Sequence, residues 1–201
     1  MSSSSDSYSA LERKFLLPAR NLLRAVYLPL VKLLAALHVS PNMVSFSQVI
    51  LAAIIVWLMP TEPRICFILF VVAIALDGVD GALARATNRA TQFGALFDQY
   101  CDHIREVVVV AGLAWHGGMN PFLAGIYGVT YPGFNLTLYL CNLYHAPLPF
   151  AIKSYLVVYP ALFVFLWFGV NMLDVAAALS IAFMALAIAV GLWRLSRAMN
   201  T

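Results

Sequence analysis

The chain has 201 residues, of which 63% are hydrophobic and only 10% are charged, and its formal net charge is +3. A soluble core of this size does not need so many apolar side chains, and water could not solvate the surface that they would form. The composition excludes a soluble domain and predicts a single integral membrane domain, and we expect no nucleic-acid partner.

Two different segments precede the first long apolar run. Residues 1–10 are small and polar, and we expect them to be disordered. In residues 11–38, leucine and aromatic residues interleave with basic ones, a pattern typical of an amphipathic helix on the cytoplasmic leaflet. A helix face in contact with water is the alternative. We assign residues 11–41 to a cytoplasmic juxtamembrane segment whose basic side chains lie at the lipid headgroups: Arg13, Lys14, Arg20, Arg24 and Lys32.

The remainder, residues 42–201, is predicted to be an all-α transmembrane catalytic domain. Ser40 is expected to cap its first helix, with Pro41 at the first helical position. Six apolar segments follow, each near the roughly 20 residues that cross a bilayer. We therefore predict six transmembrane helices, at residues 42–59, 64–86, 91–116, 120–144, 150–170 and 173–195.

The basic residues predict the orientation of these spans. If both termini are cytoplasmic, all but two of the 12 Lys and Arg residues fall on the cytoplasmic side. The exceptions are Arg64, on the opposite side, and Arg105, within a span. Tryptophans fall at the predicted outer ends of their spans, where an aromatic belt would place them: Trp57, Trp115 and Trp167.

The most informative stretch runs from Asp77 to Asp102 and reads DGVDGALARATNRATQFGALFDQYCD. It holds four of the chain's nine acidic residues, in the pairs Asp77/Asp80 and Asp98/Asp102. The first pair is spaced i,i+3 and the second i,i+4, so on helices the two members of each pair share one face. Carboxylates within membrane spans are expensive and indicate a functional site.

A short basic connector with Arg85 and Arg89 separates the two pairs and could fold their helices antiparallel. Asp77 and Asp98 would then both lie ~12 Å inward from the connector, at one level that is reachable from the cytoplasm. Four carboxylates at one point repel strongly unless protonation or a cation neutralises them. An all-oxygen ligand set favours Mg²⁺, Mn²⁺ or Ca²⁺ over Zn²⁺.

The spacing of this stretch is Asp, two residues, Asp-Gly, two residues, Ala-Arg, eight residues, Gly, three residues, Asp, three residues, Asp. It resembles the signature of the CDP-alcohol phosphatidyltransferases, membrane enzymes of phospholipid synthesis. The resemblance is strong over residues 42 to about 106 and extends to the rest only as topology. The matching positions are Asp77, Asp80, Gly81, Ala84, Arg85, Gly94, Asp98 and Asp102.

The resemblance implies an enzyme that transfers a phosphatidyl group from CDP-diacylglycerol to a small alcohol and releases CMP. It implies that Asp77, Asp80 and Asp98, with participation of Asp102, hold one or two divalent cations, Mg²⁺ or Mn²⁺. Asp102 would also be the general base that takes the proton of the acceptor hydroxyl. The family also implies a homodimer, and small residues that permit close helix contact add weak support: Ala111, Gly112, Gly125 and Gly128.

Further residues are expected to bind the CDP-linked donor. Arg85, with Asp77, would contact the diphosphate. Gly81, Ala84 and Gly94 lack bulk, which would let a nucleotide approach the backbone or would simply allow close helix packing. The family often carries a motif similar to Pro41–Ser45 in its nucleotide pocket, so the donor-binding candidates include Asn42 and Ser45, with helix capping as the alternative.

The acceptor is less constrained. Arg105 is expected to be a counter-ion of Asp102 or Glu106, or else to bind the acceptor, and Lys153 is either a positive-inside anchor or a contact for an acceptor phosphate. The later spans lack the arginines expected for a phosphorylated acceptor, which favours an uncharged or zwitterionic alcohol.

Two alternatives concern the chemistry itself. Residues 96–102 also resemble the choline- and ethanolaminephosphotransferases, which transfer from a CDP-alcohol to diacylglycerol. A divalent-cation transporter could use intramembrane aspartates too, although it would not need the Asp-Gly, Ala-Arg and Gly positions. CMP release that depends on a divalent metal separates the enzymes from the transporter.

Overall fold

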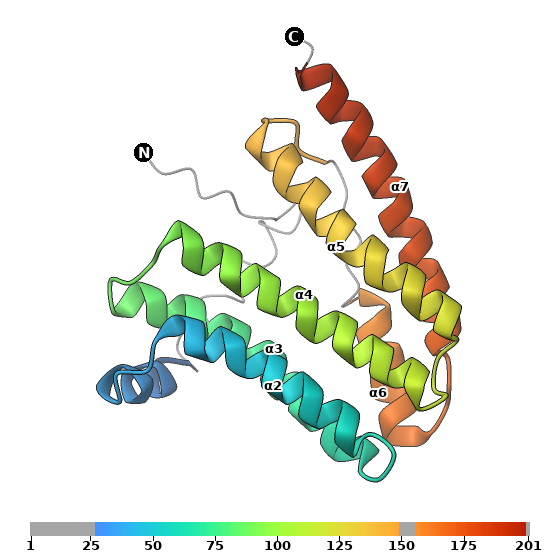
Figure 1. Cartoon of the computed structure of the whole chain (residues 1–201), viewed down its shortest axis with the longest axis horizontal. Helices are drawn as coiled ribbons and strands as arrows, with labels where there is room; N and C mark the ends of the chain where they lie inside the picture. The colour runs from blue at the N-terminus through green and yellow to red at the C-terminus, as the bar shows by residue number, and fades with distance from the viewer. Residues whose placement is uncertain (1–26, 149–155, 200–201) are drawn as a thin grey trace.

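The computed structural model describes residues 27–148 and 156–199, and these residues are helical, with no strand among them (Figure 1). A short helix, Tyr27–Ala36, comes first. It is followed by α2 (Pro41–Leu58), α3 (Pro63–Ala86), α4 (Gln92–Trp115), α5 (Pro121–Leu143), α6 (Val158–Phe168) and α7 (Leu173–Met199).

Side-chain caps fix where several of these helices begin. The Ser40 hydroxyl accepts a hydrogen bond from the Met43 amide at 3.3 Å, with Pro41 in the first turn, so the predicted cap of α2 is confirmed. At the start of α4, the Thr91 hydroxyl accepts from the Gly94 amide at 2.9 Å. The connector between α3 and α4 is therefore short, and a side-chain cap marks the residue where α4 begins.

Five of the six predicted spans coincide with helices to within a few residues. The exception is the span predicted at 150–170, because α6 covers only Val158–Phe168 and residues 149–155 lie outside the described chain. Eleven residues rise only about 16 Å, less than a bilayer core. By length and composition three described helices could cross a membrane, namely α2, α3 and α7. The all-helical fold and these apolar helices fit an integral membrane protein.

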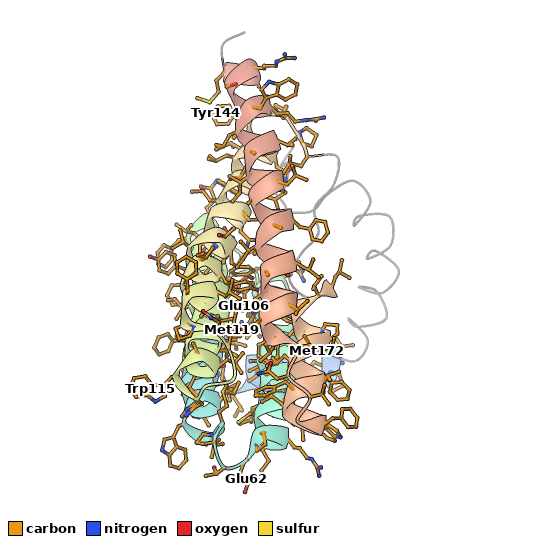
Figure 2. All side chains as sticks on the ribbon, turned by 90° about the vertical axis from the view of Figure 1, so that its right-hand side faces the viewer. Glu62, Glu106, Trp115, Met119, Tyr144 and Met172 are labelled. Carbon is orange, nitrogen blue, oxygen red and sulfur yellow. The ribbon has the colours of Figure 1, made fainter. Side chains whose placement is uncertain are left out.

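Helices α2 to α7 pack as a closed ring in which each makes its main contacts with two neighbours. Around the ring, α3 contacts α2, α2 contacts α4, α4 contacts α5, α5 contacts α7, α7 contacts α6, and α6 returns to α3. The ring has two halves, seen in Figure 1. One half consists of α2, α3 and α4, the other of α5 and α7, and α6 lies between them. Trp115 and Glu62 lie near one end of the bundle and Tyr144 near the other, with Glu106 in between (Figure 2).

The juxtamembrane segment is described only from Tyr27 onward. Its helix packs on the bundle, because Val31 is buried in one apolar cluster with Val44, Val79 and Leu83 of α2 and α3. Lys32 on the same helix is exposed. The other predicted headgroup contacts, Arg13, Lys14, Arg20 and Arg24, and the predicted acceptor contact Lys153 lie outside the described residues.

Two glycines permit the closest helix contacts within the ring. A Cβ at Gly112 of α4 would lie 2.4 Å from a methyl group of Val56 in α2, and one at Gly191 of α7 would lie 2.4 Å from Thr137 in α5. Gly112 therefore permits close contact between α4 and α2 within the chain. Gly125, by contrast, has nothing within 4 Å of its Cβ position, and Ala111 is exposed.

Candidate active site

Three predicted aspartates meet between α3 and α4. Asp77 from α3 and Asp98 and Asp102 from α4 each offer one carboxylate oxygen, and these three oxygens lie within 4.8 Å of one another. All three residues are half-buried. The i,i+4 spacing on α4 places Asp98 and Asp102 on one face, and the short connector brings Asp77 of α3 to the same level.

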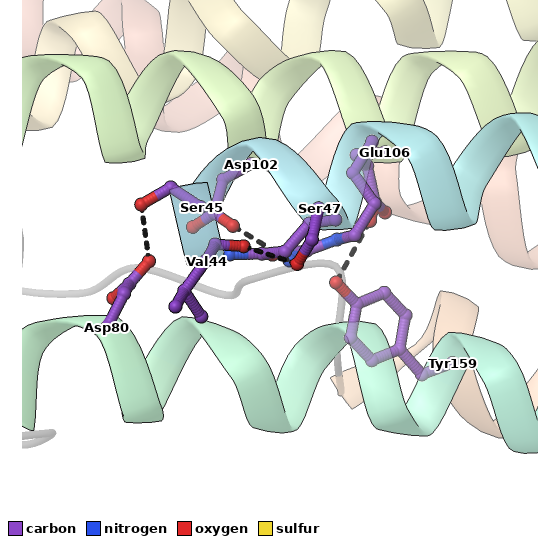
Figure 3. A network of polar contacts seen from close by, with 9 residues as sticks. Val44, Ser45, Ser47, Asp80, Asp102, Glu106 and Tyr159 are labelled. Atoms are coloured by element: carbon purple, nitrogen blue, oxygen red, sulfur yellow. Dashed lines mark hydrogen bonds and ion pairs between the residues drawn. The ribbon is translucent and has the colours of Figure 1, made fainter. Parts of the chain in front are cut away.

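Asp80 lies deeper than the other three. It is only 3% exposed, and the Ser45 hydroxyl of α2 donates to its Oδ2 at 2.6 Å (Figure 3). Its side chain also lies against that of Asp98. The sequence predicted four aspartates at one cation site, with Asp102 also the general base, and did not distinguish Asp80 from Asp77 and Asp98. The structure instead separates a three-carboxylate cluster, Asp77, Asp98 and Asp102, from a buried fourth carboxylate held by α2.

The three-carboxylate cluster fits a hard divalent cation. Asp98 Oδ1 is buried and has no hydrogen-bond partner in the described chain, so one oxygen is free to bind an ion. Converging carboxylates without a counter-charge repel one another, and burial in a membrane protein strengthens the repulsion. Carboxylate oxygens are ligands that Mg²⁺, Mn²⁺ and Ca²⁺ prefer.

The predicted donor-binding residues lie around the same end of α3 and α4. The Arg85 guanidinium folds back toward Gly81, where an added Cβ would lie 3.3 Å from Nη1. At Gly94 an added Cβ would lie 3.5 Å from Asn42 Oδ1, so α2 and α4 approach there. Ala84 is half-buried, one turn beyond Asp80 on α3. Small residues and the Arg85 guanidinium thus lie beside the carboxylates at this end.

The side chain of Arg105 is buried and hydrogen-bonded to groups inside the protein. It is 4% exposed, and its Nη1 donates to Asp102 Oδ1 at 2.7 Å and also to the side-chain oxygen of Gln48 in α2. This placement favours the counter-ion interpretation of Arg105 over contact with an acceptor, and it identifies Asp102 as the ion-pair partner.

Glu106, one residue further along α4, is satisfied by hydroxyls. It is 2% exposed and accepts hydrogen bonds from Tyr127 of α5 at 2.8 Å and from Tyr159 of α6 at 2.9 Å. Figure 3 shows Tyr159 directed at Glu106 across the bundle. The carboxylate therefore ties α4 to α5 and to α6.

Sequence reasoning missed Gln48, Tyr127 and Tyr159. Gln48 carried a signal, because it is an amide inside an apolar predicted span and lies three residues after Ser45, on the same helix face. The tyrosines carried none, since aromatic residues are common throughout these helices.

The chain is similar to known proteins of one enzyme family. The family model of the CDP-alcohol phosphatidyltransferases matches residues 38–193. The CDP-diacylglycerol–inositol 3-phosphatidyltransferase of Drosophila melanogaster is 37% identical over 75 residues, 37% of this chain and 34% of that protein. The archaetidylinositol phosphate synthase of Pyrococcus horikoshii is 33% identical over 89 residues, 43% of this chain and 46% of that protein. The alignments thus span less than half of either relative.

Among solved structures, the fold resembles that of the phosphatidylinositol phosphate synthase of Mycobacterium tuberculosis, crystallised with CDP-DAG bound. The TM-score is 0.71 at 20% sequence identity, and the match covers 85% of this chain and 94% of that one. At this identity the likeness shows a shared helical fold.

Proposed function

Since the chain belongs to the CDP-alcohol phosphatidyltransferase family, we propose that it transfers a phosphatidyl group from CDP-diacylglycerol to a small polyol and releases CMP. The observation that carries this proposal is the convergence of Asp77, Asp98 and Asp102 to within 4.8 Å. These residues belong to the family's signature, and they converge beside Arg85 and the small residues Gly81 and Gly94.

The carboxylates would hold the cation. Mg²⁺ or Mn²⁺ bound by Asp77, Asp98 and Asp102, with Asp80 completing the set, would neutralise charge on the donor diphosphate and on the CMP leaving group. Ser45 keeps Asp80 in place through their 2.6 Å hydrogen bond. Asn42, Ala84 and Gly94 would line the nucleotide side of the site, and Arg85 would add a fixed positive charge at the diphosphate.

Asp102 is the proposed general base. It would take the proton from the acceptor hydroxyl as that oxygen attacks the β-phosphorus of the donor. The bond between this phosphorus and the bridging oxygen would break, and CMP would leave with the bond's electron pair. We favour direct displacement, because the Ser45 hydroxyl already donates to Asp80 and Cys101 is buried.

We propose an uncharged cyclic polyol of the inositol type as the acceptor. The named relatives act on inositol or make inositol phosphate lipids. A phosphorylated acceptor needs free cations, and in the described chain Arg105 is buried and already holds Asp102 and Gln48. This supports free inositol over its phosphate.

Topology and assembly belong to the same proposal. We propose a multi-pass protein with six spans, both termini in the cytoplasm, the interfacial helix beside the site, and the carboxylates open to the cytoplasm. The exposed basic residues Arg85 and Arg89 at the α3–α4 connector support this orientation. We also propose a homodimer, supported by the exposed small residues Ala111 and Gly125, which permit close helix contact.

The test is CMP release by the purified chain in lipid vesicles. CDP-diacylglycerol with inositol and Mg²⁺ or Mn²⁺ should release CMP and form a phosphatidyl product, and a chelator should abolish both. Inositol phosphate, glycerol phosphate and choline serve as competing acceptors. Faster turnover with inositol phosphate would correct the acceptor but keep the donor.

Separate arms test the other functions. Product from CDP-choline and diacylglycerol, with none from CDP-diacylglycerol, would favour a choline- or ethanolaminephosphotransferase. Movement of Mn²⁺ across sealed vesicles without any CMP release would favour a cation transporter. Inside-out and right-side-out vesicles, supplied with the soluble acceptor, report the side on which the site opens.

A further inference from the structure

The proposed general base, Asp102, is ion-paired with an arginine side chain that lies inside the bundle. Arg105 sits one helical turn after Asp102 and donates to its Oδ1 at 2.7 Å. The same nitrogen of Arg105 also donates to Gln48, which is 0% exposed in α2. One guanidinium therefore joins the carboxylate on α4 to a neighbouring helix.

This arrangement leaves polar atoms unsatisfied. Gln48 Nε2 and Arg105 Nε are both buried without a hydrogen-bond partner in the described part of the chain. Each such group carries a desolvation penalty. An apolar side chain at position 48 would remove the penalty of Gln48 but would also take an acceptor from the buried Arg105. Glu106 differs, because two tyrosine hydroxyls satisfy it. Gln48 thus holds Arg105 through its side-chain oxygen, while its own amide nitrogen stays unsatisfied.

We propose that Gln48 and Arg105 are a positioning pair for Asp102. Gln48 holds the guanidinium, and the guanidinium fixes the carboxylate through Oδ1, which leaves the other carboxylate oxygen to act on the acceptor hydroxyl. This proposal rests on the proposed function and deepens it, because it names what orients the base. Neither residue touches the reacting atoms.

The charge of Arg105 has a second consequence. A cation paired with one member of the three-carboxylate cluster repels a divalent ion at that cluster and weakens its binding. Removing the charge of Arg105 should therefore tighten metal binding, and at the same time it should leave the Asp102 carboxylate less well oriented. A side chain that only supports the fold would change both properties in the same direction.

The experiment uses the full chain in vesicles with three substitutions, Gln48→Leu, Arg105→Gln and Ser180→Ala. Ser180 of α7 is the matched control, because its hydroxyl is also buried without a partner in the described chain but it lies outside the three helices of the site. Turnover, KM for CDP-diacylglycerol, thermal unfolding and Mn²⁺ binding are measured for each.

We expect Gln48→Leu to lower kcat by about 10–100-fold, the usual effect of losing a group that orients a functional ligand. Its KM for the donor and its Mn²⁺ affinity should stay near those of the parent chain, whereas its unfolding temperature should fall, because the buried Arg105 loses an acceptor. Arg105→Gln should lower kcat at least as much and bind Mn²⁺ about threefold or more tightly. Ser180→Ala should match the parent in every measurement.

The outcomes separate the two levels of the proposal. A parent chain that releases no CMP overturns the proposed function and the positioning role together. An active parent whose Gln48→Leu variant turns over within about threefold of it overturns the positioning role alone. Loss of Mn²⁺ binding in Arg105→Gln, in step with its unfolding temperature, would also overturn that role and assign Arg105 to the fold.

Discussion

The two halves of the ring differ in how their polar side chains are hydrogen-bonded. In α5, the side chains of Thr130, Asn135 and Thr137 donate to backbone carbonyls one turn earlier in the same helix, at 2.8–2.9 Å. In α2 and at the end of α3, Ser47 and Thr87 bond their own helix in the same way. In this half, however, Ser45 also reaches Asp80 and Arg105 reaches Gln48 on other helices. Bonds within one helix satisfy a polar group without fixing a neighbour, whereas bonds between helices fix relative positions, as an active site requires.

The halves are coupled through one buried carboxylate. Glu106 of α4 accepts hydrogen bonds from Tyr127 and Tyr159, which lie on α5 and α6. Tyr159 also packs edge-on against Phe70 of α3, with ring centroids 4.9 Å apart. The apolar half therefore supports the polar half at Glu106, one helical turn beyond Asp102.

The largest expected effect comes from changing the base in the polar half. Asp102→Asn keeps the size of the side chain but removes the ability to accept a proton, so kcat should fall by about 10²–10⁴-fold. The amide retains an oxygen toward Arg105, so the donor KM should change little. CMP release at saturating CDP-diacylglycerol measures the loss. Normal turnover would show that the base lies elsewhere.

The next effect tests the link between the halves. Tyr127→Phe or Tyr159→Phe removes one of the two hydroxyls that satisfy Glu106, and each should destabilise the fold by about 1–3 kcal/mol. The double variant should lose more, because the buried carboxylate then lacks both donors. Unfolding in detergent, followed by temperature or denaturant, measures the cost. Tyr144→Phe, on an exposed tyrosine at the bundle end, is the control.

Most of the helical framework could be predicted from the sequence, because apolar length and helix caps are local signals. Ser40 and Thr91 each bond an amide three residues away, and these bonds set the starts of α2 and α4. The region 150–170 was harder to place, since α6 is a short apolar helix that ends at Gly169 in the left-handed conformation, with φ of 75°. Hydropathy alone does not distinguish such a helix from a span.

The residues of the site could be predicted from the sequence, but not how deeply each is buried or which partner it bonds. Spacing indicated that Asp77, Asp98 and Asp102 would share a level. It could not show that Asp80 is buried against Ser45, because that depends on how α2 packs over α3. The partner of Arg105 was open for the same reason, since Gln48 lies 57 residues away.

A third prediction concerns packing between helices in both halves. Gly112→Ala would place a Cβ 2.4 Å from Val56, so α4 and α2 must separate, and the fold should lose about 1 kcal/mol or more. Gly125→Ala, on open α5 surface, should be neutral or slightly stabilising, since alanine favours helix. Unfolding measurements compare the two. Equal losses would show that helix propensity, and not contact with α2, decides the effect.

The smallest effect should come from the side chains that bond their own helix. Thr130→Val replaces a hydroxyl that donates to the Ile126 carbonyl at 2.8 Å. That carbonyl keeps its backbone hydrogen bond, and valine has nearly the same shape, so stability should change by less than about 0.5 kcal/mol. Turnover should also be unchanged.

Ser45→Ala is the counterpart in the polar half, where loss of a hydroxyl leaves the buried Asp80 without its donor from α2. It should lower both the unfolding temperature and CMP release, because an unsatisfied buried carboxylate costs more than an unsatisfied carbonyl. If Thr130→Val proved as damaging as Ser45→Ala, the polar groups of α5 would contribute to the site, and the contrast between the two halves would be wrong.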